Sequence, residues 1–150
     1  DCQSRGRRVG SRQAAGALYN QAAKDRVLAN AIARAVKRFS ADLILVGLAG
    51  SGLIGAGVEA GLTVASEGFP DRNYNPDGTL VSRKQANAVI QSSEEVAAHA
   101  LKLAQQGMEM SGHNIRVNTL CLHGDHPNAA QNARLVREML EKSKIEIAGL

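Results

Sequence analysis

A segment that begins at Glu67 concentrates reactive side chains. It holds three carboxylates, two guanidinium groups and a phenol, which come from Glu67, Asp71, Asp77, Arg72, Arg83 and Tyr74. The planar fork of an arginine binds both oxygens of a carboxylate or a phosphate, and a carboxylate can hold a metal or activate water. Composition alone leaves two interpretations open: a functional site, or a solvated loop whose charges pair with one another.

A second candidate site is the run His123-Gly124-Asp125-His126-Pro127, which follows the apolar residues 120–122. Histidine is the side chain best suited to proton transfer near neutral pH, so we predict a catalytic or substrate-binding role for His123. Metal binding by His123, Asp125 and His126 is an alternative, although two histidines three residues apart on a turn are a weak signature. A third interpretation is that Asp125 or Asn128 only caps the following helix.

The third candidate is a glycine pattern after an apolar run. Gly50, Gly52 and Gly55 satisfy the G-x-G-x-x-G spacing of dinucleotide-binding turns. The helix that follows is short, however, and a tight turn with close helix packing explains the same glycines. The sequence contains no G-x-x-x-x-G-K-[ST] motif, so a nucleoside triphosphate used here would not be held by a P-loop.

The spacing of apolar residues predicts alternating helices and short buried strands around these sites. Expected helices cover residues 28–39, 51–60, 92–104 and 128–142, and expected strands cover 43–46, 62–65, 117–122 and 145–147. The first helix should bury Leu28, Ile32, Ala35, Val36 and Phe39. This order predicts a parallel sheet with right-handed crossovers. Because functional loops gather at the carboxyl ends of such strands, we expect the Glu67 segment and the His123 turn on one common edge.

Composition restricts the classes of function. One domain suffices for 150 residues. The net charge of +4 comes mostly from residues 1–12, where four arginines face one aspartate, and the chain has few aromatic residues; both facts argue against nucleic-acid binding. The longest uncharged stretch, residues 43–58, is short and rich in glycine, so no membrane span is expected. Two cysteines cannot form a disulfide framework, which favours the cytoplasm.

Taken together, these segments resemble the LamB/YcsF family. The resemblance rests on several blocks in one order: Gly16-Ala-Leu-Tyr-Asn20, Asp42 to Ser51, Glu67, Asp71-Arg72, Tyr74-Asn75, Asp77 to Val81, Arg83 and Cys121-Leu-His-Gly-Asp125. It also has a departure, because the family's Lys-Pro-His before the first block is replaced by Gln13, Ala14 and Ala15.

The resemblance implies a fold and an extent. The family fold is similar to a seven-stranded β/α barrel related to sugar deacetylases, so we expect α/β structure forming an arc of a parallel β/α barrel. Residues 16–150 should be the C-terminal part of the barrel, and residues 1–15 an unmatched basic tail. An arc leaves strand edges unpaired, so an inactive remnant of the barrel remains a further alternative.

The resemblance also implies an activity and site residues. Family members are the A-subunit of an ATP-dependent 5-oxoprolinase, which opens the 5-oxoproline lactam to glutamate, so we expect ATP as co-substrate, with Mg²⁺, and subunits B and C as partners. His123, Asp125, Glu67 and Asp71 are the expected catalytic residues. His123 with Asp125 would activate water, and Glu67 and Asp71 could hold the metal that accompanies ATP. Substrate would be bound by Arg72 or Arg83 at its carboxylate and by Tyr74, Asn75, Tyr19 and Asn20.

Overall fold

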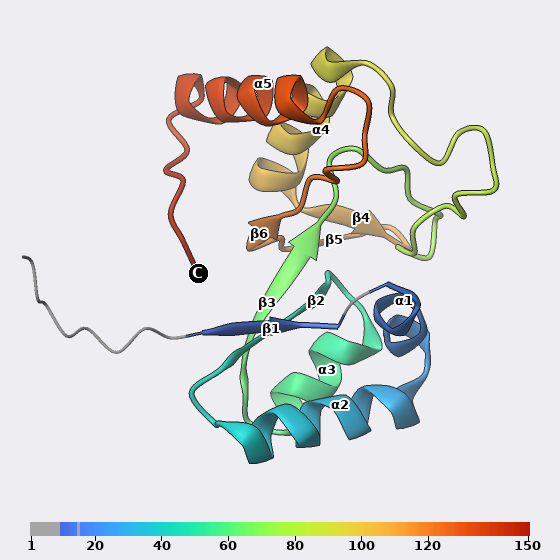
Figure 1. The fold of residues 1–150 in the computed structure, drawn as a ribbon, viewed down its shortest axis with the longest axis vertical. Helices are drawn as coiled ribbons and strands as arrows, with labels where there is room; N and C mark the ends of the chain where they lie inside the picture. The colour runs from blue at the N-terminus through green and yellow to red at the C-terminus, as the bar shows by residue number, and fades with distance from the viewer. Residues whose placement is uncertain (1–9, 15) are drawn as a thin grey trace, which may run out of the picture.

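The fold is organised around a four-stranded parallel sheet in the order β1-β2-β3-β6 (Figure 1). The computed structural model describes residues 10–14 and 16–150; residues 1–9 and 15 of the predicted basic tail lie outside the described residues. The strands are β1 (Ser11–Gln13), β2 (Ile44–Leu48), β3 (Thr63–Gly68) and β6 (Thr119–Leu120). The sheet is curled into half of a barrel, which confirms the predicted partial parallel β/α barrel.

The register brings the carboxyl ends of the four strands together. Gln13 is opposite Val46 on β2, Leu48 is opposite Glu67 on β3, and Glu67 is opposite Thr119 on β6. The segments that follow these strands therefore leave the sheet at one edge, which we call the rim. Glu67 belongs to the buried strand itself and not to the loop that follows it.

Helices pack in two groups (Figure 1). The first group is α1 (Ala17–Lys24), α2 (Arg26–Phe39) and α3 (Gly52–Glu59), which pack on one another and on β2 and β3. The second is α4 (Ser93–Gln106) with α5 (Ala129–Lys142). The predicted helices are thus all present, with an additional short helix, α1, before the first of them.

Side-chain caps set the starts of two of the long helices. The Asp25 carboxylate accepts from the backbone N–H groups of Val27 and Leu28, at 2.9 and 3.1 Å, where α2 begins. At the start of α4, Ser92 Oγ accepts from the N–H of Glu95 at 3.3 Å. Each cap satisfies a donor that has no partner within the helix.

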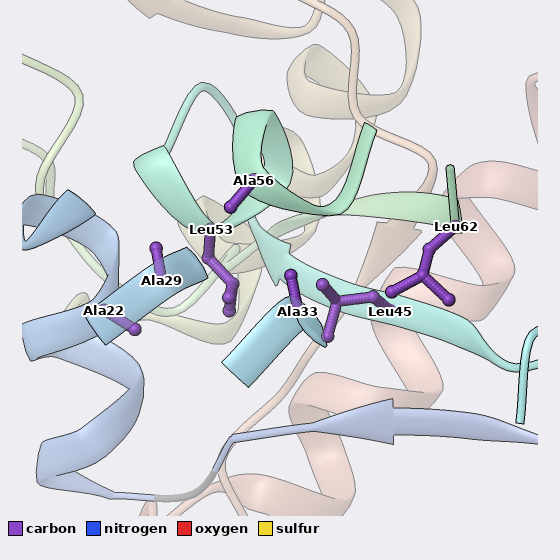
Figure 2. Packing of buried hydrophobic residues seen from close by; sticks show 7 residues of the cluster. All are labelled: Ala22, Ala29, Ala33, Leu45, Leu53, Ala56 and Leu62. Atoms are coloured by element: carbon purple, nitrogen blue, oxygen red, sulfur yellow. The ribbon is translucent and has the colours of Figure 1, made fainter. Parts of the chain in front are cut away.

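One hydrophobic cluster joins the first group of helices to the sheet. Figure 2 shows Leu45 of β2 beside Ala33 of α2, with Leu53 and Ala56 of α3 packed against them. Ala29 and Ala33 are fully buried. Small residues on α2 let the helix lie close to its neighbours, so the core there is built from alanine methyl groups and a few leucines.

The buried stripe of α2 matches the predicted one in part, because Leu28, Ile32 and Val36 are half-buried and pack against this cluster. Ala29 and Ala33 are buried, whereas Phe39 is 76% exposed and Ala35 is also exposed. Phe39 lies at the end of the helix, where the guanidinium of Arg12 stands 5.9 Å from its ring centroid. Periodicity locates the helix, but the residues it buries depend on how the helix is rotated against its neighbours.

Two predicted strands differ in the structure. The strand expected over 117–122 is regular only at Thr119–Leu120, although the N–H of Cys121 still donates to the carbonyl of Gly68 at 2.9 Å. Residues 145–147 form no strand. There Lys144 has a positive φ of 59° and the Ile145 N–H donates to the Leu140 carbonyl at 3.0 Å, so the chain turns back to close α5.

Three further strands are present that the apolar pattern does not predict. Ser11–Gln13, within the segment predicted as a basic tail, pairs with β2 as an edge strand. A hairpin of β4 (Met108–Met110) and β5 (His113–Ile115) follows α4. Each strand has three residues, too few to show an alternating pattern, so their residues carry no local signal.

Glycine substitutions in α3 test how closely this helix packs on the sheet. A Cβ on Gly57 would lie 2.6 Å from Val64 Cγ1 and 2.9 Å from Leu45 Cδ2, whereas a Cβ on Gly55 meets nothing within 4 Å. We expect Gly57→Ala to lower the free energy of unfolding by about 1–2 kcal/mol through overpacking. Gly55→Ala should raise it by up to about 1 kcal/mol through helix propensity. Urea denaturation of both variants measures this, and a stabilised Gly57→Ala would contradict the packing.

Candidate functional site

The rim brings together side chains from segments that are far apart in the sequence. β1 contributes Gln13, α1 contributes Tyr19, β3 contributes Glu67, and the turns after β3 and β6 contribute Asp71 and His123. The predicted common edge for the Glu67 segment and the His123 turn is therefore present. The neighbouring positions of β3 and β6 in the sheet create it, because their carboxyl ends lie side by side.

Asp71 and His123 form the central pair of the site. Asp71 Oδ2 accepts from the backbone N–H of His123 at 3.0 Å, and the ring Nδ1 of His123 lies 2.9 Å from Oδ2 and 3.0 Å from Oδ1. The Asp71 side chain is 1% exposed and that of His123 is 24% exposed. A buried carboxylate thus holds one side of a histidine that still reaches solvent.

The surroundings of the pair fix the orientation of the imidazole. The His123 ring stacks on Phe69, with centroids 5.4 Å apart and an interplanar angle of 21°, and Phe69 meets Tyr19 edge to face. Because Nδ1 is directed at Asp71, the opposite nitrogen, Nε2, is the one left to act on another molecule. A carboxylate that orients an imidazole in this way is a recurrent arrangement for a general base.

Asp71 is held in its charged form. Burial by itself would raise the pKa of the Asp71 carboxyl, but hydrogen bonds from the ring and the backbone N–H of His123, with the charge of that ring, outweigh burial and lower the pKa. A carboxylate that accepts from Nδ1 leaves the proton on that nitrogen. In the neutral form of the ring, Nε2 then carries the lone pair.

The pKa of Glu67 is shifted in the opposite direction from that of Asp71. Its carboxylate is buried and accepts from the Tyr19 hydroxyl at 2.9 Å and from the Gln13 amide. Burial raises the pKa of Glu67; the hydrogen bonds from Tyr19 and Gln13 and the charge of His123 offset that rise only in part. Burial and the Glu67 charge likewise raise the pKa of Tyr19. Glu67 can therefore hold a proton at a higher pH than an ordinary glutamate.

Asp125 does not pair with His123 as expected. Its carboxylate accepts from Arg83 Nη1 at 2.8 Å, at a solvent-exposed position. The partner of His123 is Asp71, for which the sequence predicts a metal-binding role together with Glu67. The correction follows from topology: Asp71 comes from the turn after β3, which lies next to β6, whereas Asp125 lies two residues beyond His123 on an exposed turn.

Arg72 is buried and bonded to the loop backbone. Its Nε donates to the Ala88 carbonyl at 3.1 Å and its Nη2 to the Val81 carbonyl at 2.7 Å. Burial, and then the charge of Arg83, lower the pKa of Arg72. These bonds tie the start of the long loop between β3 and α4, residues 69–92, to its later parts. Of the two predicted substrate-binding arginines, the half-exposed Arg83 has the greater freedom to meet a ligand.

Tyr74 and Asn75 have structural partners within the same loop. The Tyr74 hydroxyl accepts from the Phe69 N–H at 2.6 Å, and Asn75 Nδ2 donates to Thr79 Oγ1 at 2.9 Å. Asn20 lies apart from them, on the wall of a cavity that also includes Arg83. The loop therefore uses two of its predicted substrate-binding residues to hold its own shape.

Two glycines of the G-x-G-x-x-G pattern, Gly50 and Gly52, are explained by backbone conformation and packing, whereas a Cβ on Gly55 would meet nothing within 4 Å. Gly50 has a φ of 73°, which favours glycine, and a Cβ there would lie 3.0 Å from the sulfur of Met110. A Cβ on Gly52 would lie 3.3 Å from the carbonyl oxygen of Ala23. The Met110 side chain and the Ala23 backbone thus fill the space beside Gly50 and Gly52. This favours the close-packing alternative over a dinucleotide site.

His126 is bonded at both ring nitrogens. Nε2 lies 2.9 Å from the Ile90 carbonyl, and Nδ1 accepts from the Asn128 N–H at 3.0 Å. This leaves no lone pair for a metal, so the alternative of a His123–Asp125–His126 metal site loses one ligand. Among residues 10–14 and 16–150, no group of three or more His, Cys, Asp or Glu side chains is arranged to hold a metal ion.

Three residues near the site make contacts that the sequence analysis does not predict. Gln13 contacts Glu67, and its polar edge strand carries no signal. Phe69 stacks on the ring of His123. Its position between the end of a predicted strand and Asp71 is the sequence feature that could have indicated this contact. His99 of α4 is half-buried, with Nδ1 2.9 Å from the Pro70 carbonyl, and burial lowers its pKa. None of the helices in the described part of the chain is both long and apolar enough to span a bilayer.

Comparison with known proteins gives consistent matches. Residues 2–150 match the LamB/YcsF family. The 5-oxoprolinase A-subunit of Methylococcus capsulatus is 49% identical over 140 residues, which cover 90% of this chain and 54% of that protein. The protein of the same name from Tolumonas auensis is 48% identical over 139 residues, with 90% and 55% covered. The chain spans about half the length of these curated relatives.

A solved structure matches as well. The crystal structure of a lactam utilization protein from Thermus thermophilus superposes with a TM-score of 0.80 at 39% identity. The match covers 94% of this chain and 57% of that one. The similarity therefore extends over nearly the whole chain.

Replacing Asp71 tests the pH dependence of the central pair. Because the folded-state pKa of Asp71 is lowered, its contribution to stability is complete above the unfolded pKa, about 3.9, and is lost as pH falls through the folded value. We expect Asp71→Asn to lower the free energy of unfolding by about 1.5–3 kcal/mol near pH 7. The difference from the unsubstituted chain should shrink below about pH 4. Denaturant melts from pH 3 to 7 measure it, with exposed Glu109→Gln as control; a pH-independent difference would refute the assignment.

Removing the Tyr19 hydroxyl tests the environment of Glu67. That hydroxyl stabilises the carboxylate, so Tyr19→Phe should raise the pKa of Glu67 further. The titration is followed by ¹³C NMR of the glutamate carboxyl. Tyr74→Phe is the matched control, because the Tyr74 hydroxyl accepts from Phe69 and makes no bond to Glu67. A lower or unchanged Glu67 pKa in Tyr19→Phe would contradict the site.

Proposed function

The chain belongs to the LamB/YcsF family, and from this membership and the geometry of the rim we propose that it is part of a 5-oxoprolinase A-subunit. In this proposal it contributes to the ATP-dependent hydrolysis of the 5-oxoproline lactam to L-glutamate. Subunits B and C would be its partners and the cytoplasm its location. The resemblance first noted in the motifs is confirmed by the family match.

The observation that carries the proposal is the Asp71–His123 pair at the carboxyl ends of β3 and β6. The pair combines a buried, charged carboxylate with an imidazole that is 24% exposed. His123 borders a cavity of about 190 Å³ that Asp71, Arg83 and Gln91 also line. An oriented base that opens onto a polar cavity is what activation of a water molecule requires.

The chemistry of the substrate explains why such a base would be coupled to ATP. Amide resonance protects the carbonyl carbon of an unstrained lactam from water. Transfer of the γ-phosphoryl group to the carbonyl oxygen, with release of ADP, removes that protection and creates a leaving group. Water can then add to the carbon, and the C–N bond breaks with a proton going to nitrogen, which leaves the acyl phosphate of glutamate. A second water hydrolyses this acyl phosphate, which gives glutamate and releases phosphate.

Residues of this chain have distinct tasks in the proposal. His123 Nε2 takes the proton of the attacking water while Asp71 holds the ring and stabilises the charge that forms on it. Arg83 would meet the substrate carboxylate with the part of its guanidinium that Asp125 does not bind. Glu67, whose pKa is raised by burial, supplies a carboxyl that can hold a proton near the base.

Mg²⁺ enters the proposal with ATP and not as a resident ion. Glu67 accepts from Tyr19 and Gln13, and Asp71 accepts twice from His123. Both carboxylates thus have other partners in the structure, and the proposal gives them tasks other than the metal binding expected for them. The tasks proposed for the chain are therefore confined to its own side chains.

Substitution of His123 tests the proposed function. In a full-length protein that contains this segment, assembled with subunits B and C, His123→Ala should lower 5-oxoproline-dependent ATP hydrolysis by at least about 100-fold, as loss of a general base does. Coupled assays of ADP and glutamate formation measure it.

The control is His113→Ala, which removes an exposed histidine of the β4–β5 hairpin and should leave turnover near that of the unsubstituted protein. Equal turnover in the two variants would refute the role of His123. A protein that binds its partner subunits but forms no glutamate even without substitution would refute the proposed function itself.

A further inference from the structure

A second cavity, separate from the one that His123 borders, opens beside the rim. It has a volume of about 410 Å³ and lies between the end of α1 and the middle of the long loop. Asn20 and Lys24 line it from α1, Leu48 from the end of β2, and Thr79, Ser82 and Arg83 from the loop. We call it the basic cavity.

The charge of the basic cavity is one-sided. Among the described residues, its lining contains the cations Lys24, Arg72 and Arg83 and no carboxylate. Acidic groups act from outside the lining. Asp71 and Asp125 oppose the lowering of the pKa of Arg72. Asp125 is bonded to Arg83, and Asp77, on which the charge of Lys24 acts, is bonded to Thr79. A concave surface with charges of one sign attracts ions of the opposite sign and raises their local concentration.

The three cations differ in what they can still bind. Arg72 uses Nε and Nη2 on backbone carbonyls and acts as a fixed buried charge. Arg83 uses Nη1 on Asp125, so the rest of its fork remains for a ligand. Lys24 is exposed in the last turn of α1, where the three N–H donors of its ammonium group can adjust to the position of a ligand. Neutral hydrogen-bonding groups are added by Asn20, Thr79 and Ser82.

We propose that the basic cavity is an oxyanion-binding site in which Lys24 and Arg83 hold either a phosphate group of the nucleotide or the carboxylate of the lactam. This inference rests on the proposed function and deepens it, because it gives the anionic part of a substrate a place. Arg72 and Arg83 line both this cavity and the one that His123 borders. An anion held at Arg83 therefore lies next to the space in which the base acts.

Binding to the full chain tests the proposal with three probes: MgATP, inorganic phosphate and 5-oxoproline, each followed by isothermal titration calorimetry. Lys24→Ala should weaken binding of the ligand that occupies the cavity by about tenfold, as expected for loss of a charged hydrogen bond. Binding should also weaken as salt is raised. A weakened affinity for MgATP and phosphate identifies a phosphate site, and a weakened affinity for 5-oxoproline alone identifies a carboxylate site.

Lys84→Ala is the matched control, since Lys84 follows Arg83 but does not line the cavity; it should bind each probe as the unsubstituted chain does. Asp125→Asn gives an effect of opposite sign, because it releases Arg83 and should tighten anion binding. Absence of binding by all three probes, or equal effects of Lys24→Ala and Lys84→Ala, would overturn the proposal.

The binding experiment on the basic cavity and the assay of lactam opening can fail independently. Oxyanion binding that depends on Lys24, in a protein whose full-length form opens no lactam, upholds the cavity and refutes the reaction. Lactam opening that depends on His123 but is indifferent to Lys24 upholds the reaction and refutes the cavity.

Discussion

The site depends on one interaction, the acceptance by Asp71 of two N–H groups of His123. These residues are separated by 52 positions in the chain, and they meet because β3 and β6 are neighbours in a parallel sheet. The buried carboxylate would be costly without these donors. The pair therefore positions an imidazole for chemistry and also joins the turn after β6 to the turn after β3.

A second polar network supports the turn that carries His123. His126 bonds the Ile90 carbonyl at the end of the long loop, and Asn132 of α5 lies 3.3 Å from His126 Nδ1. Asn132 in turn accepts from the Ser93 hydroxyl at the start of α4, at 2.6 Å. His126, whose spacing from His123 would allow a metal ligand, thus joins the loop to helices α4 and α5 through hydrogen bonds. Buried polar groups bonded in this way restrict a structure to one arrangement.

The two buried carboxylates of the rim show how environment separates chemically similar groups. Asp71 receives donors from the ring and the backbone of His123, which lower its pKa, whereas the neutral donors to Glu67 do not overcome burial. One carboxyl is therefore kept ionised and the other is inclined to hold a proton. Such divergence of pKa values within one site is common where proton transfer takes place.

Local patterns in the chain were enough to predict helices α2 to α5, the inner strands, the parallel sheet and the positions of the reactive segments, because apolar periodicity and element order are properties of neighbouring residues. The motifs were enough to predict the family. Side-chain partners came only from the folded chain: Asp71 and not Asp125 with His123, and Gln13 with Glu67. The exposure of Phe39 and the bonding of Arg72 to the loop backbone also emerge only there. Contacts across the sheet depend on register, helix rotation and burial, which no local pattern records.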